Sequence, residues 1–219
     1  MALGRIEKRL IGCWGMRKVF GVGTVMEGAG PGEASLRFGS LALRLLPSAG
    51  DHQPVPDLSA YVGRALMFSG ELPTPNGTLN RAEAHWTSLA DGEGMIETMC
   101  CATVTGNAGS APEVAASGGR VSLSIAYANR GRGEAQETSW LKVGATQFLD
   151  SFNQLQQVEA GARLIVSGTL ESYIYEEANY LRLIVFGVSL NGPAVASSMP
   201  SFSAIGTAGS SELPREAAL

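Results

Sequence analysis

Apolar and polar residues alternate along much of this chain with a period of two. In the segment 120–129, Val121, Leu123 and Ile125 alternate with small or polar residues. This alternation is typical of a β-strand with one buried and one exposed face. Similar or largely apolar runs predict further strands, at 16–28, 34–47, 63–72, 81–92, 99–105, 139–145, 163–172 and 179–190. The pattern therefore predicts a chain made mainly of strands.

One segment, 145–161, has a helical period instead. Its large apolar residues fall three or four positions apart, at Phe148, Phe152, Leu155 and Val158. That spacing indicates one apolar helix face, so we interpret Phe148 as a core residue. The helix falls between the third and fourth strands of the second half, which is the order of an OB-fold, a small five-stranded barrel.

Two segments of the chain resemble each other. "GRALMFSGEL" at 63–72 and "GARLIVSGTL" at 161–170 share Gly, an apolar run, Ser-Gly and Leu. A weaker similarity aligns Gly23 with Ala102. Chance similarity between two glycine-rich β segments is the alternative, but we favour a duplicated small β domain.

We therefore predict an all-β protein of two tandem OB-like units, each with one short helix. The first unit is a divergent OB-like domain at 16–98, with a short helical region at 55–63. The second is an OB-fold domain at 99–192. The last stretch, 193–219, lacks periodicity and is rich in Ser, Ala, Gly and Pro, so we expect a flexible tail.

Charge restricts the partners of the chain. The 219 residues carry 16 Lys and Arg against 20 Asp and Glu, a formal net charge of −4. A surface that attracts phosphate everywhere is excluded by this balance, so any nucleic-acid site must be local.

Several function classes are disfavoured by the absence of motifs. No Gly-x-Ser-x-Gly or phosphate-binding Gly-Lys-Ser/Thr motif occurs, so we do not expect an enzyme. The cysteines, Cys13, Cys100 and Cys101, lack metal-site spacing and are expected to be reduced thiols of a cytoplasmic protein. No metal or cofactor is expected, and no run is long and apolar enough to predict a membrane span.

Five motifs follow one another over about residues 99–192 of the second unit: "TGNAGSAPEV", "SGGRVSLSIAYAN", "QETSWLKV", "GARLIVSGTL" and "NYLRLIVFGV". In their order and spacing they resemble the single-stranded DNA-binding protein (SSB) family of bacteria and phages. The resemblance implies an OB-fold that binds single-stranded DNA in replication, recombination or repair of a bacterial, plasmid or phage genome.

The resemblance also implies stacking residues. Trp140 stands where the family places a stacking Trp, Tyr175 aligns with another family Trp near a hairpin tip, and Phe148 lies close to a family Phe. Tyr173 lies two residues before Tyr175 and so on the same face of its strand. Aromatic rings stack on bases without reading sequence. The alternative for Trp140 is a place in the core.

The basic residues of the second unit are candidates for phosphate contacts: Arg120, Arg130, Arg132, Lys142, Arg163 and Arg182. We include the first four in the predicted site. Arg130 and Arg132 fall in the loop between the second and third strands, which either wraps a phosphate backbone or is an ordinary solvated loop. Two features depart from the family: the hairpin "ESYIYEE" is acidic, and the chain ends in "SSELPREAAL" rather than an acidic, Phe-terminated tip.

The sequence thus predicts a non-catalytic binder of single-stranded DNA. The alternative is an OB-fold assembly protein that makes only protein contacts, and binding of RNA or an oligosaccharide stays open. We expect a homodimer with four barrels, with a homotetramer as the alternative. The final strand, apolar on both faces over 181–188, is a candidate for the contact.

Overall fold

The computed structural model describes residues 16–48, 55–73, 82–95, 97–129, 137–175 and 177–190. The described chain is built mainly of strands, as predicted. In chain order the elements are β1 (Arg17–Val25), β2 (Ala34–Phe38), β3 (Leu41–Pro47), a 3₁₀-helix η1 (Leu58–Tyr61), β4 (Ala65–Glu71), β5 (Glu83–Asp91), β6 (Met99–Ala108), β7 (Glu113–Val114), β8 (Arg120–Asn129), β9 (Glu137–Thr146), helix α1 (Ser151–Gln156), β10 (Arg163–Tyr175) and β11 (Ala178–Leu190).

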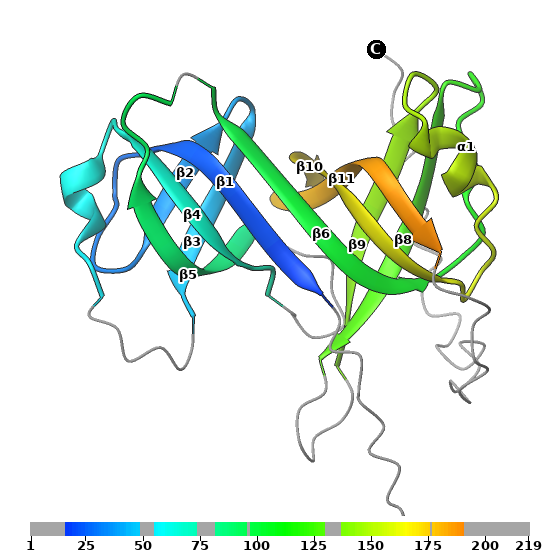
Figure 1. Ribbon diagram of the computed structural model, residues 1–219, viewed down its shortest axis with the longest axis horizontal. Coiled ribbons are helices and arrows are strands. Elements are labelled where there is room, and N and C mark those ends of the chain that lie inside the picture. Colours follow the sequence, from blue (N-terminus) through cyan, green and yellow to red (C-terminus); the bar gives the residue numbers. More distant parts are fainter. Residues whose placement is uncertain are drawn as a thin grey trace, which may run out of the picture.

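The strands form two barrels that lie side by side (Figure 1). In the first barrel the order is β2-β3-β5-β4-β1, and pairing of β1 with β2 closes the ring. In the second the order is β6-β10-β11-β9-β8, closed by pairing of β6 with β8. Closure satisfies strand edges that would otherwise pair with other chains.

Both barrels have the OB-fold arrangement. Each contains one parallel pair, β3 with β5 in the first and β9 with β11 in the second, and its other strand pairs are antiparallel. In each, a short helix lies between the third and fourth strands of the ring. The predicted fold class, all-β with OB-fold barrels, is therefore confirmed. In the first barrel that helix is a single 3₁₀ turn.

The residues shared by the two similar segments occupy equivalent places. Gly63 and Gly161 both have positive φ, 79° and 81°, which favours glycine. Gly70 and Gly168 both sit at a shift of strand register, where a Cβ atom would lie 2.1 Å from the carbonyl oxygen of the facing strand. The sequence similarity thus marks backbone positions where the fold requires glycine.

The weaker similarity is aligned differently by the structure. Gly23 pairs with Leu66 in the first barrel, and Gly106 pairs with Leu164 in the second. Leu66 and Leu164 correspond in the similar segments, so Gly23 corresponds to Gly106 and the predicted match with Ala102 is wrong by four residues. The reason is steric, since both glycines face a close backbone carbonyl of the next strand.

A direct strand pairing joins the barrels. β1 and β6 run antiparallel from Arg17↔Val104 to Val22↔Met99, so the sheet continues from one barrel into the next (Figure 1). The amide of Ala82 also donates to the carbonyl of Asn179 at 3.1 Å. Each barrel is therefore held to its neighbour by backbone hydrogen bonds and not only by the chain connection.

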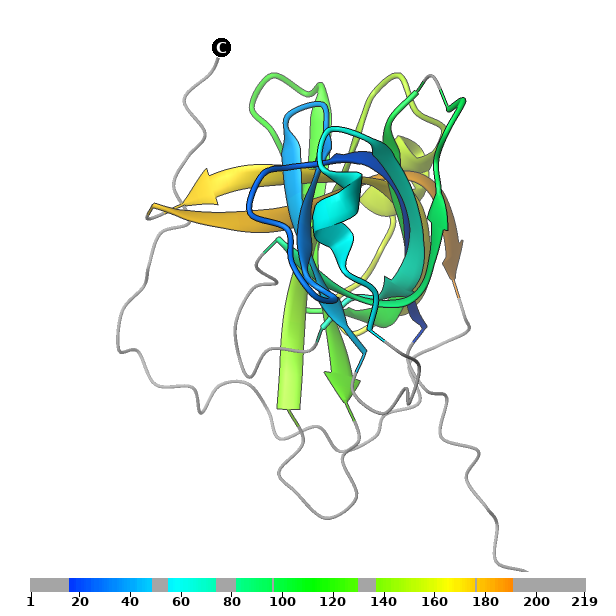
Figure 2. The same cartoon turned by 90° about the vertical axis from the view of Figure 1, so that its left-hand side faces the viewer.

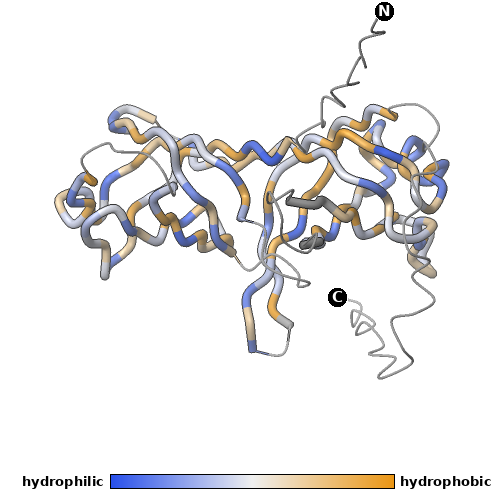
Figure 3. The backbone as a smooth tube through the Cα atoms, turned by 90° about the horizontal axis from the view of Figure 1, so that it is seen from below, coloured by the Kyte–Doolittle hydropathy of each residue, from blue (hydrophilic) through white to orange (hydrophobic). Residues whose placement is uncertain are grey.

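The core follows the predicted alternation. Apolar and polar positions alternate along the strands (Figure 3), and the inward residues Val121, Leu123 and Ile125 are buried. Helix α1 covers one end of the second barrel with its buried residues Phe152 and Leu155. No helix in the described part of the chain is long and apolar enough to cross a membrane.

The core interpretation of Phe148 is wrong. Its side chain is 86% exposed, because α1 begins only at Ser151 and Phe148 lies in the turn before the helix. The three- and four-residue spacing continues through Phe152 and Leu155, but helical periodicity places a residue on the buried face only where the backbone is helical.

Candidate nucleic-acid interface

The outer face of the second barrel carries the predicted Trp and Lys side by side. On β9, Trp140 and Lys142 are half-buried, whereas Leu141 and Val143 between and after them are fully buried. Successive side chains of a strand point to opposite faces, so Trp140 and Lys142 share the outward face about 7 Å apart along the strand.

Trp140 has small residues next to it. Across the strand pair it lies opposite Ala126, and Lys142 lies opposite Ser124. Its ring rests on Gly109, where an added Cβ atom would lie 2.3 Å from ring atom Cζ3. Trp140 therefore lies partly exposed on the barrel surface, and the alternative of a core residue is excluded by this position.

Two tyrosines extend this face onto the neighbouring hairpin. The Lys142 ammonium lies 5.6 Å from the ring centroid of Tyr173, within the range of a cation–π contact. The Tyr173 ring in turn lies 5.9 Å from that of Tyr180, its partner across β10 and β11. We call Trp140, Lys142, Tyr173, Tyr180 and Arg182 the aromatic patch.

Arg182 brings a second cation to the patch. It lies beside Lys142 in the parallel pairing of β11 with β9. Its Nε donates to Glu171 Oε2 at 3.0 Å, and one terminal nitrogen approaches the same oxygen at 2.9 Å. The patch therefore combines aromatic rings with two cations, one of them engaged by a carboxylate.

The other predicted site residues lie elsewhere or outside the described part. Arg120 pairs with Thr146 at the opposite end of the β8–β9 pair from Trp140, and exposed Phe148 follows that same end. The β10–β11 hairpin projects from the barrel (Figure 2), and the backbone of Tyr175 lies near its tip. The Tyr175 side chain and all of Arg130 and Arg132 are outside the described residues, as is the predicted tail.

Sequence reasoning missed Tyr180 as a site residue. The signal that could have found it is the hairpin itself. Tyr173 and Tyr180 are equally distant from the turn between Tyr175 and Ala178, so they face each other across the strands. Arg182 was included among the basic residues, but its place beside Lys142 depends on the parallel pairing of β9 and β11, which no local pattern predicts.

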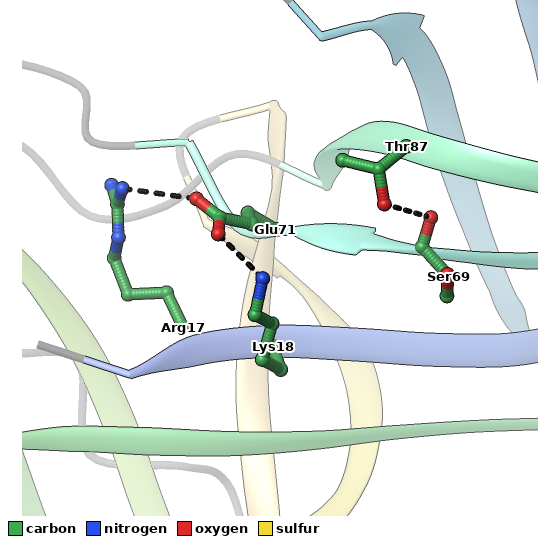
Figure 4. A network of polar contacts seen from close by, with 5 residues as sticks. All are labelled: Arg17, Lys18, Ser69, Glu71 and Thr87. Atoms are coloured by element: carbon green, nitrogen blue, oxygen red, sulfur yellow. Dashed lines mark hydrogen bonds and ion pairs between the residues drawn. The ribbon is translucent and has the colours of Figure 1, made fainter.

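Four of the described cations of the first barrel have carboxylate partners. Glu71 accepts from Lys18 at 2.8 Å and from Arg17 at 3.2 Å (Figure 4). The hydrogen bond from Lys18 is the main reason that the pKa of Glu71 is lowered. Arg64 donates to Asp91 at 2.7 Å. These cations therefore have local carboxylate partners.

The aromatic residue of the first barrel's last strand is structural. Trp86 on β5 is buried, and its indole Nε1 donates to the carbonyl of Gly32 at 2.7 Å. A buried indole whose only donor is satisfied is held in the core and offers no face to a base.

Two solved structures are similar to this fold. A deletion mutant of the single-stranded DNA binding protein from Thermus aquaticus matches with a TM-score of 0.54 and 15% identity, over 84% of this chain and 98% of that one. The wild-type Thermus aquaticus protein matches with a TM-score of 0.53 and 17% identity, over 83% and 97%. The predicted resemblance to the SSB family is thereby confirmed at the level of the fold.

No protein-family model matches the sequence, and no curated protein matches it. At the identities found with the two structures, the likeness is one of fold. Function has to be argued from the residues of this chain.

Proposed function

We propose that this protein binds single-stranded DNA without catalysis and protects it during replication, recombination or repair. The observation that carries the proposal is the aromatic patch, in which a partly exposed Trp140 lies on one barrel face with Lys142, Tyr173 and Arg182. The fold is shared with two solved structures of a protein named as a single-stranded DNA binding protein.

The patch suits single strands for physical reasons. Unpaired bases expose their faces, and each base stacked on an aromatic ring contributes roughly 1 to 3 kcal/mol. The Trp140 ring packs against Gly109 and is partly exposed, and we expect its exposed part to stack on a base. Lys142 and Arg182 lie beside the rings and supply phosphate contacts. Recognition of this kind is independent of sequence.

The alternative is an assembly protein that contacts only other proteins. It is favoured by the ion-paired cations of the first barrel and by exposed apolar side chains on the outer face of the joined sheet, Phe20, Met67 and Met99. These three residues line a shallow hollow of about 230 Å³. Exposed apolar patches commonly mark protein contacts.

A fluorescence titration separates the two functions. We expect oligothymidylate to quench the tryptophan emission of the protein, and the effect to weaken as salt rises. Trp140→Phe is the matched variant, because it removes the reporter at the patch and keeps the other two tryptophans, Trp14 and the buried Trp86. Unchanged emission at micromolar protein, together with no change in the anisotropy of a labelled oligonucleotide, would contradict DNA binding.

We also propose that the chain forms a homodimer with four barrels, built from duplicated domains at 16–98 and 99–192. The apolar hollow around Phe20 supports a second copy as partner, since a twofold interface pairs identical patches and closes on itself. Phe186 on β11, 56% exposed, is the other candidate contact.

Light scattering should give a mass near twice 22.8 kDa. Phe20→Asp should halve it if the hollow is the interface, and a wild-type monomer would contradict the dimer.

A further inference from the structure

We propose that Glu171 competes with DNA phosphate for Arg182 and thereby weakens DNA binding by the aromatic patch. This inference rests on the proposed function and assigns a regulatory role at the same site. In the free protein, the Arg182 guanidinium donates to the Glu171 carboxylate through two nitrogens, at 3.0 and 2.9 Å. A phosphate oxygen would take the place of that carboxylate oxygen.

The position of Glu171 within the patch supports this role. Glu171 pairs with Arg182 across β10 and β11, and Tyr173 and Tyr180 form the equivalent pair two residues nearer the hairpin tip. Arg182 is also in register with Lys142 of β9. The carboxylate therefore lies among the residues that are proposed to hold the strand.

Glu171 is unusual among its neighbours. Of the described residues at outward positions of β8, β9, β10 and β11, it is the only carboxylate; on β8 and β9 these positions hold Arg120, Ser122, Ser124, Ala126, Trp140, Lys142, Gly144 and Thr146. A core function does not explain it, because 43% of its side chain is exposed. A negative charge there opposes an approaching phosphate.

The ion pair can exchange with phosphate. It is partly buried, with 24% of the Arg182 side chain and 43% of the Glu171 side chain exposed, so water reaches both groups and screens part of their attraction. Arg182 keeps a charged acceptor when it turns to phosphate, whereas Glu171 is left as a negative charge beside the DNA. Binding is therefore weaker than the same face would give without the carboxylate, and the bound strand leaves more readily.

A different role for Glu171 makes the opposite prediction. If the carboxylate instead orients Arg182 toward DNA, removing its charge would loosen the guanidinium and weaken binding. The two roles are therefore separated by the sign of the change in affinity on Glu171→Gln.

The test is a thermodynamic cycle with four proteins: wild type, Glu171→Gln, Arg182→Gln and the double variant. Affinity for labelled oligothymidylate is measured by anisotropy at several salt concentrations. We expect Glu171→Gln to tighten binding about two- to fivefold, the range that matches loss of a competing ion pair open to solvent on one side. The slope of the logarithm of the binding constant against the logarithm of the salt concentration, here called the salt slope, should steepen by about 0.7. That is the change expected for one more phosphate contact on a single strand.

The controls make the outcome specific. Glu159→Gln removes the same charge from an exposed residue after α1, away from the patch, and reports the general effect of net charge. In the Arg182→Gln background, Glu171→Gln should give no more than this general effect. Unchanged or weaker binding by Glu171→Gln, or an equal gain with and without Arg182, would overturn the inference. Absence of binding by the wild type would instead contradict the proposed function itself.

Discussion

Trp140 of the second barrel and Ala42 of the first stand at equivalent positions. In the parallel strand pair of each barrel, Lys142 is in register with Arg182 and Arg44 with Glu83. Two residues earlier on the same outward face lie Trp140 and Ala42. The same place in the fold therefore holds an indole ring in one barrel and a methyl group in the other.

Charge differs between the barrels in the same way. Arg44 occupies the place of Lys142, but it donates to Glu33 at 3.0 Å and lies 3.7 Å from Glu83. In the second barrel the residue at the place of Glu83 is Arg182. The first barrel thus neutralises the cation that the second presents beside its rings.

The connection between the second and third strands of the ring also differs. Phe38 and Leu41 are joined by Gly39 and Ser40 alone, whereas residues 130–136 separate β8 from β9. The glycines and the buried residues are thus alike in the two barrels, while the outward residues differ. We infer that the buried residues and glycines specify the fold and that the outward residues specify the proposed DNA binding, and we predict that only the second barrel binds DNA.

The largest expected effect tests what the barrels share. Gly70→Ala and Gly168→Ala each place a Cβ atom 2.1 Å from a backbone carbonyl oxygen. We expect each to lower the free energy of unfolding by about 3 kcal/mol, at the upper end for overpacking. Chemical denaturation measures it. Gly187→Ala is the control, since nothing lies within 4 Å of its added Cβ atom. A small loss at either site would show that the two bulges are not equivalent.

Removing the Trp140 ring from the aromatic patch tests a side chain that the first barrel lacks at the equivalent position. Trp140→Ala should weaken oligothymidylate binding by about 1 to 3 kcal/mol, because one stacked base is lost. Tyr61→Ala removes a partly buried aromatic of the first barrel and should leave the affinity unchanged. Anisotropy titrations give both values, and circular dichroism reports folding. Equal losses in the two variants would contradict the division of function.

The paired cations give a smaller effect. Lys142→Gln should reduce the salt slope of binding by about 0.7, as expected for one lost phosphate contact on a single strand. Arg44→Gln changes the equivalent residue of the first barrel, whose charge is already neutralised. Its slope should match that of the wild type. A reduced slope in Arg44→Gln would place DNA on the first barrel as well.

The smallest effect concerns acid stability of the first barrel. The pKa of Glu71 is lowered in the folded protein, chiefly by the hydrogen bond from Lys18. Its stabilising contribution is therefore present at pH values above its unfolded pKa and is lost as pH falls through the lower folded value. Glu71→Gln should lower Tm slightly at pH 7 and not at pH 2. An equal Tm difference at both pH values would exclude the ion pairs as its cause.

Much of the fold could be predicted from local patterns. The strand at 120–129 was predicted with its observed bounds, because Val121, Leu123 and Ile125 alternate without interruption. The glycines of the similar segments predicted two related units, since each meets a local backbone requirement. The prediction was wrong at Phe148, because this residue matches the period of α1 but lies before the first turn of the helix.

The site could be predicted only in part. Trp140, Lys142 and Tyr173 were predicted to belong to one site, and the structure brings them to one face. Arg120 and Phe148 lie at the end of the β8–β9 pair away from Trp140. Their distance from Trp140 is set by the register of the two strands, which the resemblance to a family does not give. The pairing of β1 with β6 joins residues far apart in the sequence, and no short-range pattern indicates it.

Photo-crosslinking tests the central claim most directly. Oligothymidylate carrying 5-iododeoxyuridine is bound to the wild-type protein and irradiated, and the crosslinked peptides are identified by mass spectrometry. Such probes react with aromatic side chains that stack on the modified base. We predict crosslinks at Trp140 and on the hairpin that carries Tyr173 and Tyr180, lost when excess unlabelled oligothymidylate is added. Crosslinks on β1 to β5, or none on the second barrel while DNA is bound, would contradict the account.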